Sequence, residues 1–298
     1  MCIRDSWWEG VGKLAELLAP AIHECLSGTP RIDPAAVPLL IGVADKSRAG
    51  RPARLDEQLL AELQARLEFP LHPRSGLFPA DQIGAVHGLH LAQDLIRTRV
   101  CDVAIVAGVD SFLQQQMLDA CIEDRRLNTP SNSNGFYPGE AAAAVLVADT
   151  AAADRRSLRI VGAGSAREPA PIMSTSAFRA EGLTAAVAEA LSSARLEMHQ
   201  VAWRLTDLSG EHYGFKEAAM VAGRFGGGPR EIALDLWHPI EFLGEIGAAI
   251  LPCLLAQAHH AFLHGYAPGR IALCHIGNDA GDRAALLLTC ESLDGAPG

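Results

Sequence analysis

The 298-residue sequence lacks any hydrophobic stretch long enough to cross a membrane as a helix. Its longest apolar runs, at residues 141–148 and 247–256, fall well short of the roughly 20 residues that such a helix needs. It also lacks a basic stripe interleaved with aromatic residues, and its formal net charge of −10 would repel a phosphate backbone. We therefore expect neither a membrane span nor a nucleic-acid partner.

Motifs for metals, cofactors and disulfides are absent as well. No Cys-x-x-Cys pair or His-Glu-x-x-His motif occurs, and the glycine-rich segment at 160–166 lacks the third glycine of a dinucleotide fingerprint. We therefore expect no metal and no cofactor. The cysteines are scattered through apolar patterns, which indicates reduced thiols in a cytoplasmic protein. They are Cys2, Cys25, Cys101, Cys121, Cys253, Cys274 and Cys290.

The opening residues 1–6 (MCIRDS) do not have the character of a signal peptide. They resemble translated sequencing-adapter sequence fused to a reading frame truncated at its 5′ end. We therefore leave these six residues out of the interpretation of the fold.

Hydrophobic periodicity predicts a chain in which strands and helices alternate. Short buried apolar runs predict strands at 37–44, 102–108, 141–148, 158–164, 203–209, 232–237, 271–276 and 284–290. Apolar spacing of period 3.6 predicts helices at 11–26 with a break near Pro20, 55–67, 84–97, 112–122, 182–196, 216–225 and 244–263. This order indicates an α/β fold with mostly buried, largely parallel sheets that are covered by helices.

A sequence pattern that occurs twice indicates two similar halves. Gly139-Glu140 and Gly281-Asp282 each place a glycine and an acid before a buried strand that closes its part of the chain. We therefore expect an N-terminal half at 7–150 and a C-terminal half at 151–298.

Three stretches, in this order, resemble β-ketoacyl synthases of the thiolase superfamily. Residues 100–111 (VCDVAIVAGVDS) are similar to the family's strand with Asp-Val, an apolar run, Ala-Gly and a following acid. Residues 134–148 (NGFYPGEAAAAVLVA) resemble its Asp-Gly-Phe, Gly-Glu-Gly-Ala and closing strand. Residues 241–249 (EFLGEIGAA) resemble its His-x-Leu-Gly-x-x-Gly-Ala segment with the histidine exchanged. Residues 276–288 then fall where the family's glycine-rich turn and final strand lie.

The resemblance implies a thiolase-like five-layer α-β-α-β-α sandwich built from two similar halves, with a site between them at helix N-termini. The family's first strand and neighbouring elements have no counterpart here, so the first elements of the fold are expected to be missing. The resemblance also implies acyl carrier protein or acyl-CoA as a partner, and a homodimer or a heterodimer with a related subunit.

The residues that would condense acyl chains are replaced. Condensing members of the family use a thiol at a helix N-terminus and two histidines. By motif, these roles fall on Gln82, Ser209 and Glu241, and the family's lysine falls on Leu236. Gln82 cannot become an acyl thioester, and Glu241 would place negative charge where an enolate needs stabilisation.

We interpret the sequence as that of a non-condensing subunit that binds an acyl group, a carrier protein or a partner. In having a glutamine at the nucleophile position, it resembles chain-length factors. The alternative is an active acyltransferase or hydrolase on acyl thioesters, in which Glu241 works with His238 or Glu211. A further alternative is that the polar residues only satisfy one another in a former active-site cavity. The candidate pocket comprises Gln82, Asp207, Ser209, Glu211, His238, Glu241 and Asn278.

Overall fold

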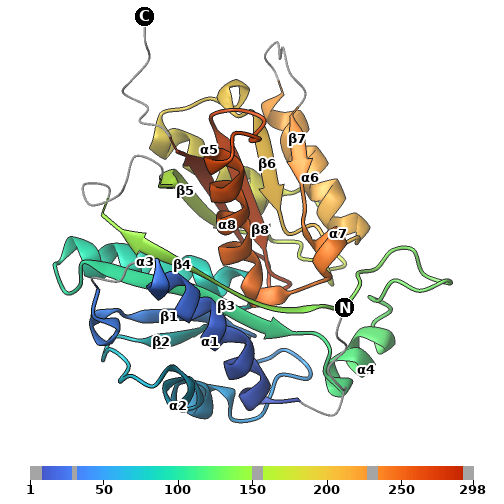
Figure 1. Ribbon diagram of the computed structural model, residues 1–298. Coiled ribbons are helices and arrows are strands. Elements are labelled where there is room, and N and C mark those ends of the chain that lie inside the picture. Colours follow the sequence, from blue (N-terminus) through green and yellow to red (C-terminus); the bar gives the residue numbers. More distant parts are fainter. Residues whose placement is uncertain (1–8, 29–31, 150–156, 227–233, 291–298) are drawn as a thin grey trace, which may run out of the picture. The chain divides into compact units, whose positions relative to one another are not determined.

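The computed structural model describes residues 9–28, 32–149, 157–226 and 234–290. Contacts divide the chain into two compact units (Figure 1). The first unit contains Met1–Asp149 and Phe242–Cys253, and the second contains Thr150–Glu241 and Leu254–Gly298. The opening residues 1–6, Cys2 and the expected boundary at residue 150 lie outside the described residues, so the division of the sequence at that boundary stays a prediction.

The first unit is built on a four-stranded sheet in the order β2-β1-β3-β4. Its strands are β1 (Leu39–Val43), β2 (Gly76–Pro79), β3 (Val103–Ser111) and β4 (Glu140–Ala148). Strand β1 is parallel to β2 and β3, whereas β4 pairs antiparallel with β3 along nine residues. The carboxyl ends of β1, β2 and β3 therefore meet at one edge, which is where binding sites form in parallel α/β sheets.

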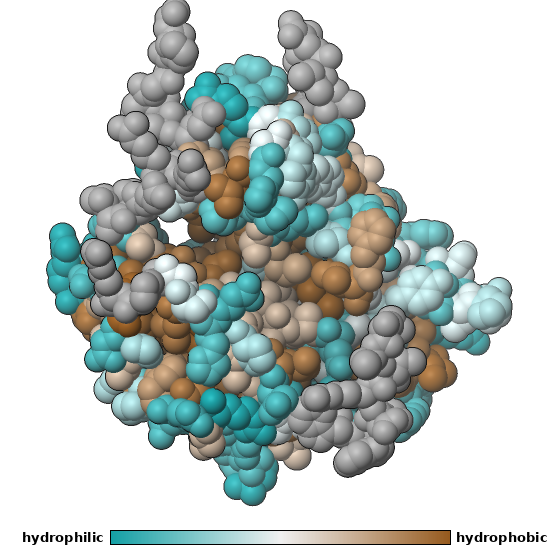
Figure 2. Space-filling view, in the orientation of Figure 1, coloured by the Kyte–Doolittle hydropathy of each residue, from teal (hydrophilic) through white to brown (hydrophobic). Residues whose placement is uncertain are grey.

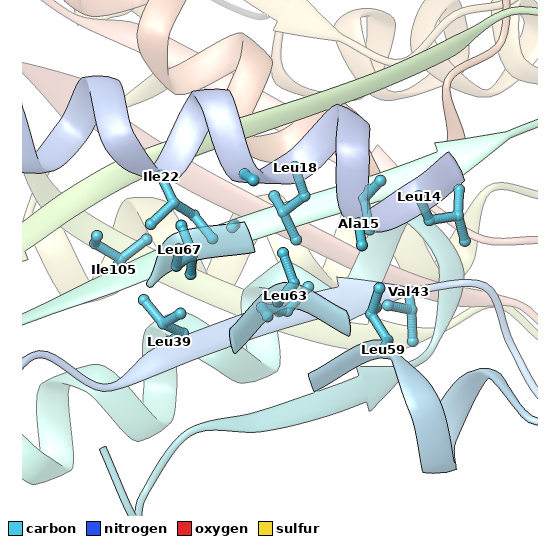
Figure 3. Close-up of a cluster of buried hydrophobic side chains, with 14 of the residues drawn as sticks. Leu14, Ala15, Leu18, Ile22, Leu39, Val43, Leu59, Leu63, Leu67 and Ile105 are labelled. Carbon is cyan, nitrogen blue, oxygen red and sulfur yellow. The ribbon is translucent and has the colours of Figure 1, made fainter. Parts of the chain in front are cut away.

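Helices cover both faces of this sheet. They are α1 (Val11–Ser27), α2 (Leu55–Leu67), α3 (Gly84–Arg97) and α4 (Gln115–Glu123), with short 3-10 turns η1 (Pro34–Ala36) and η2 (Asp81–Ile83). Side chains of α1 and α2 pack with Leu39 and Ile105 in one apolar cluster (Figure 3). Val106, whose side chain points the opposite way, lies against Gly88 of α3. The alternation of the strand thus assigns α1 and α3 to opposite faces.

The second unit contains a five-stranded sheet in the order β5-β9-β8-β6-β7. Its strands are β5 (Arg159–Arg167), β6 (Trp203–Thr206), β7 (Asp235–Trp237), β8 (Ala272–Gly277) and β9 (Asp282–Thr289). Strand β6 is parallel to β7 and β8, and β9 is antiparallel to β8 and β5. Helices α5 (Glu181–Ala194) and α6 (His212–Phe225) belong to this unit, with the 3-10 turn η3 at Met198–Gln200.

The two sheets follow one plan. The order β4-β3-β1-β2 of the first unit repeats β9-β8-β6-β7 of the second, with an antiparallel strand at the same position in each. This repetition confirms two similar α/β halves. In each sheet all strands but one run in the same direction, as expected of largely parallel sheets, and the strand that closes each half is the one that returns antiparallel.

Most predicted elements are confirmed, but two helix predictions are wrong and one strand was missed. The first helix continues through Pro20, because Pro20 lies on the exposed face, where the carbonyl left without its helical donor can meet water. Strand β2 was not predicted, because its four residues include both glycine and proline. The helix expected at 244–263 begins only at α8 (Ile250–Leu263), after the short helix α7 (Ile240–Leu243) and the 3-10 turn η4 (Gly247–Ala249), because Gly244 and Gly247 adopt positive φ angles.

The surface agrees with the composition. Hydrophilic residues cover much of the visible face in the space-filling view (Figure 2). Among the described helices, none is long and apolar enough to cross a membrane.

Candidate functional site

The predicted pocket residues lie just beyond the carboxyl ends of parallel strands. In the second unit, Asp207 follows β6, His238 follows β7 and Asn278 follows β8. Ser209 and Glu211 continue the loop after β6, and Glu241 lies in α7. In the first unit, Gln82 lies in η2 directly after β2. The two sheets therefore each carry polar residues at the edge where parallel α/β sheets bind ligands.

Gln82 belongs to a buried cluster of charged residues in the first unit, which we call the Arg48 cluster. The guanidinium of Arg48 donates through Nη1 to Asp81 Oδ1 at 3.1 Å and to Asp110 Oδ2 at 2.7 Å, and through Nη2 to Asp110 Oδ1. Gln82 Nε2 donates to Glu245 Oε1 at 3.4 Å. The Arg48 cluster comprises Arg48, Asp81, Gln82, Asp110 and Glu245.

The Arg48 cluster contains one cation and three carboxylates. Only 13% of the Arg48 side chain is exposed, and its guanidinium lies 4.7 Å from the ring centre of Phe112. Burial alone would lower the pKa of Arg48, but Asp110, Asp81 and Glu245 outweigh that effect and raise the pKa. Arg48 is therefore charged at any physiological pH, and its role is to hold the carboxylates together.

Asp81 occupies the turn that leads into α3. Its backbone has a φ of 49°, in the left-handed region that residues other than glycine seldom adopt. Its Oδ1 atom accepts the backbone N–H of Asp45 at 2.8 Å as well as the Arg48 donor. A carboxylate therefore fixes the strained turn in front of α3, and the Gln82 amide stands beside it.

The segment between α7 and α8 completes the Arg48 cluster. Asp110 Oδ2 accepts the backbone N–H of Ala248 at 3.0 Å, and Glu245 Oε1 accepts that of Gly247 at 2.9 Å. A Cβ atom at Gly247 would lie only 2.1 Å from Asp110 Oδ2, and the φ of Gly247 is 48°. Glycine is therefore required for the chain to approach Asp110 this closely.

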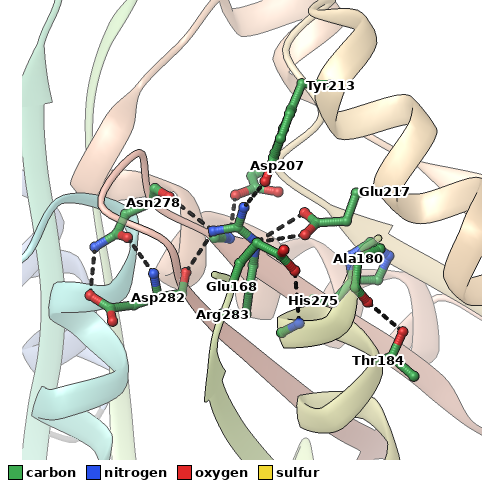
Figure 4. A network of polar contacts seen from close by, with 12 residues as sticks. Glu168, Ala180, Thr184, Asp207, Tyr213, Glu217, His275, Asn278, Asp282 and Arg283 are labelled. Atoms are coloured by element: carbon green, nitrogen blue, oxygen red, sulfur yellow. Dashed lines mark hydrogen bonds and ion pairs between the residues drawn. The ribbon is translucent and has the colours of Figure 1, made fainter. Parts of the chain in front are cut away.

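In the second unit, Asp207 and Asn278 lie in a network centred on Arg283 (Figure 4). Arg283 Nε donates to both carboxylate oxygens of Glu217 at 2.9 Å, and Nη2 donates to the hydroxyl of Tyr213 at 3.0 Å. Arg283 Nη1 donates to the backbone oxygen of Asn278 at 2.9 Å. Asp207 Oδ2 accepts the N–H of Gly277 at 2.8 Å. The network ties the β8–β9 turn to α6 and to the end of β6.

Burial shifts the acidities of this network. It raises the pKa of Asp207 to about 6, although the Gly277 N–H and Arg283 oppose the shift. Burial likewise raises the pKa of Glu217 to about 7, against the opposing effect of Arg283. Such values suit general acid–base chemistry near neutral pH. Because Glu217 already binds Arg283 and Asp207 already binds Gly277, the contacts of both groups are those of a structural network.

The remaining predicted residues make few contacts that would assemble a catalytic set. The Glu241 N–H donates to the backbone oxygen of His238 at 3.2 Å, and the Glu241 side chain is exposed. The His238 ring packs edge-on against Phe215 with centres 5.6 Å apart. Within the described part of the chain, no hydrogen bond or ion pair joins the side chains of His238 and Glu241. Glu211 precedes α6 at its N-cap, and Ser209 lies two residues before it.

The described cysteines are all free thiols, and none lies in η2 or at the start of α3. Burial raises the pKa of Cys25 to about 11 and also raises the pKa values of Cys101, Cys253 and Cys274. Among the described residues, no group of three or more His, Cys, Asp or Glu could hold a metal ion.

Seven residues of these two networks received no role from the sequence. Asp81, Asp110, Glu245 and Arg283 lie inside or beside motifs that were recognised, whereas Arg48, Tyr213 and Glu217 carry no local signal. A buried partner can be foreseen for an acid at the end of a parallel strand, as at Asp110. The identity of that partner depends on loop paths that periodicity does not encode.

Comparisons with known proteins agree with the fold. A family model described as Beta-ketoacyl synthase, N-terminal domain, matches residues 84–153. An oxazolomycin ketosynthase domain from Streptomyces albus JA3453 is 15% identical with a TM-score of 0.67, over 96% of this chain and 61% of its own. The module 6 ketosynthase of the bacillaene synthase from Bacillus subtilis 168 is 15% identical with a TM-score of 0.68, over 93% and 60%.

The ishigamide ketosynthase/chain length factor is 15% identical with a TM-score of 0.62, over 88% of this chain and 75% of its own. A search of curated proteins found no match. The expected resemblance is confirmed: the chain has the thiolase-like fold of ketosynthases, and it spans about three fifths of the first two solved chains.

Proposed function

We propose that this ketosynthase-like chain is a non-condensing subunit that binds an acyl group on a carrier protein or on CoA, or a related partner chain. It would work in the cytoplasm, as a homodimer or as a heterodimer with a related subunit. In this proposal it forms no carbon–carbon bond.

The observation that supports the proposal most directly is the composition of the turn in front of α3. The resemblance implies that condensing relatives carry a thiol there, at the N-terminus of a helix. Here the turn holds Asp81, bound by Arg48 and the Asp45 N–H, and Gln82, bound to Glu245. A carboxylate and an amide cannot form the acyl thioester through which condensation proceeds.

The electrostatics around this turn support the same conclusion. Condensation develops negative charge on the decarboxylating substrate, and that charge needs donors or cations nearby. Asp81, Asp110 and Glu245 already use the one guanidinium in the Arg48 cluster. The positions that the resemblance assigns to histidines carry Ser209 and Glu241, so the cationic or neutral donors of a condensing enzyme are replaced.

The test is to incubate the chain with carrier protein loaded with malonyl or acyl groups and to follow the mass of the carrier over time. We expect an unchanged mass, together with saturable binding of the loaded carrier in a fluorescence anisotropy titration. Gln82→Ala should weaken the preference for loaded over unloaded carrier, because the amide lies where the acyl group would approach.

The same experiment tests the alternative, in which the chain is an active enzyme. If the carrier loses its acyl group or its malonyl carboxylate, and Glu241→Ala abolishes that loss, the chain is an acyltransferase, decarboxylase or hydrolase and the proposal is wrong. An unchanged carrier mass without any binding of carrier would also contradict it.

A further inference from the structure

The side-chain amide of Gln82 is held in one orientation. Its Nε2 atom lies 3.4 Å from Glu245 Oε1. An ionised carboxylate accepts hydrogen bonds and cannot donate them, so the nitrogen of the amide, and not its oxygen, must face Glu245. In the described part of the chain, no donor bonds to Gln82 Oε1. The carbonyl oxygen of this amide is therefore the atom that remains available to a ligand.

Gln82 lies at the boundary between the Arg48 cluster and the outside of the first unit. The residue is partly exposed, whereas Asp81, Asp110 and Glu245 are buried. A ligand that approaches the turn in front of α3 can therefore contact the Gln82 oxygen. The buried carboxyl groups lie behind this oxygen, within the cluster.

The Arg48 cluster surrounds the Gln82 oxygen with more negative than positive charge. Its three carboxylates outnumber the one guanidinium, and each also accepts a backbone N–H group, which brings a hydrogen bond but no net charge. The N-terminus of α3 adds only about half a positive charge. Arg48 Nε has no hydrogen-bond partner among the described residues, but it is buried, so a ligand outside the cluster cannot reach it. A ligand at Gln82 therefore meets an acceptor in a negative electrostatic field.

This field acts over a short distance. A donor bonded to Gln82 Oε1 lies about 8 Å or less from the Glu245 carboxylate, since only one amide group and two hydrogen bonds separate them. Two unit charges at that separation near a protein surface change a binding constant by about tenfold or more. The charge of a bound acyl group should therefore affect its affinity strongly.

The acceptor and the field together rank acyl groups by charge. A malonyl group brings a carboxylate toward an acceptor and toward buried carboxylates, and both contacts are repulsive. A saturated acyl group offers the oxygen neither a donor nor a charge. An aminoacyl group brings an ammonium, which donates to the oxygen and is attracted by the cluster.

We propose that the acyl group bound at Gln82 bears an amine, and that acyl groups with a carboxylate, such as malonyl, are excluded. This inference rests on the proposed function, because an acyl group must first enter the turn in front of α3. The Gln82 oxygen accepts a hydrogen bond from the ammonium, and the carboxylates of Asp81, Asp110 and Glu245 supply the negative field. The Arg48 cluster thus determines which class of acyl group binds.

The test compares four acyl groups of matched shape on pantetheine, each joined through an amide so that the acyl group is not transferred. Glycyl and propionyl have equal numbers of heavy atoms, and the glycyl amine is positively charged at pH 7. Malonyl and isovaleryl are matched in the same way, and malonyl is negatively charged. Isothermal titration calorimetry with the 298-residue chain gives the four dissociation constants. We expect glycyl to bind at least about tenfold more tightly than propionyl, and malonyl at least about tenfold more weakly than isovaleryl.

Two variants test whether the Arg48 cluster is the source of the preference. Glu245→Gln removes one negative charge and keeps an acceptor for the Gly247 N–H, so both preferences should fall by about threefold or more. Glu57→Gln removes the same charge from an exposed position on α2 and should leave both preferences unchanged. Circular dichroism checks that both variants fold. The comparison of the four compounds on the parent chain does not depend on either variant.

The outcomes separate this inference from the proposed function. If glycyl binds no better than propionyl, or malonyl binds as tightly as isovaleryl, the inference is wrong and the proposed function stands. If Glu57→Gln reduces the preferences as much as Glu245→Gln does, the preference comes from the net charge of the chain, and the inference is also wrong. If none of the four compounds binds, acyl binding itself is contradicted, together with the inference.

Discussion

Arg48 is the residue that holds together the polar edge of the first unit's sheet. Its side chain joins the loop after β1 to the turn after β2 through Asp81 and to the end of β3 through Asp110, and it also attracts Glu245 electrostatically. Removing a single partner from a buried ion cluster leaves uncompensated charge, which costs far more than the loss of one exposed pair.

We therefore expect Arg48→Met to lower the free energy of unfolding by about 3–5 kcal/mol, because it leaves Asp81 and Asp110 buried without their cation. The matched control is Arg54→Met, since Arg54 pairs with Glu57 while about two thirds of both side chains is exposed. The control should change stability by about 0.5 kcal/mol or less. Urea unfolding measures both, and equal effects would contradict the assigned role of Arg48.

The buried ring of His275 makes the stability of the fold depend on pH. Burial, followed by Arg204 and Arg283, lowers the pKa of His275 to about 3 from its ordinary 6.5. Between these values the unfolded chain binds a proton that the folded chain does not. The contribution of neutral His275 is therefore complete above pH 6.5 and is lost as pH falls toward 3.

In a His275→Gln variant this loss should disappear. The difference in unfolding free energy between the parent and the variant should fall by about 1.4 kcal/mol per pH unit within the window. The comparison is needed because the raised pKa values of Asp207 and Glu217 act in the opposite sense, as both groups gain stability on protonation. A difference that stays constant from pH 7 to pH 4 would show that the ring is not kept neutral.

At the same scale, the sequence identified positions better than partners. Asp207 and Asn278 were chosen from motifs, and the structure gives both a place in one network. The alternative reading pairs Glu241 with His238, and in the described part of the chain no hydrogen bond or ion pair joins their side chains. Arg48 and Glu217 are charged residues without a motif, so only the fold reveals what they bind.

At the scale of elements, periodicity succeeded where a helix is long and amphipathic. Helices α2 and α3 have the predicted bounds, because their apolar residues recur on one face and turn residues flank them. For the segment at 244–249, the same method gave the wrong prediction. The spacing of its apolar residues predicts a helix, but the positive φ angles of Gly244 and Gly247 direct the chain into a turn that approaches Asp110.

The close approach of this turn to Asp110 depends on Gly247. Gly247 and Gly265 both have positive φ, at 48° and 71°, but only at Gly247 would a Cβ atom meet a buried carboxylate. Gly265→Ala should cost about 1 kcal/mol for backbone strain alone. Gly247→Ala should cost about 1–3 kcal/mol more, since Asp110 must move and its bond to Ala248 is disturbed.

Thermal and urea unfolding of the two glycine variants give the comparison directly. Gly247→Ala should also weaken the Arg48 cluster, so combining it with Arg48→Met should cost less than the sum of the two single changes. Additive effects would mean that the turn and the cluster are independent.

At the scale of the whole molecule, the fold was predictable and the chemistry was not. Order and spacing of three motifs sufficed for a thiolase-like fold, because the two halves repeat one sheet plan. Sequence identities near 15% to solved ketosynthases show how far side chains can change while that plan persists. The resemblance assigns the condensing roles to only three positions, which carry Gln82, Ser209 and Glu241 in this sequence.

A non-condensing chain should also lack an activated thiol anywhere in the described fold. The pKa of Cys25 is raised to about 11, and those of Cys101, Cys253 and Cys274 are raised as well, so little thiolate exists at pH 7. Iodoacetamide should modify these four cysteines at least about tenfold more slowly in the folded chain than in urea, because only the thiolate reacts.

Peptide mass spectrometry measures the modification of each cysteine separately, so labelling of Cys2 is distinguished from labelling of the described thiols. If one of the four reacted faster in the folded chain than in urea, the fold would be activating that thiol. The chain would then hold a nucleophile away from the turn in front of α3, and covalent acyl chemistry would have to be sought there. Slow labelling at all four cysteines would mean that none of these thiols is activated to bind an acyl group covalently, as the proposed function requires.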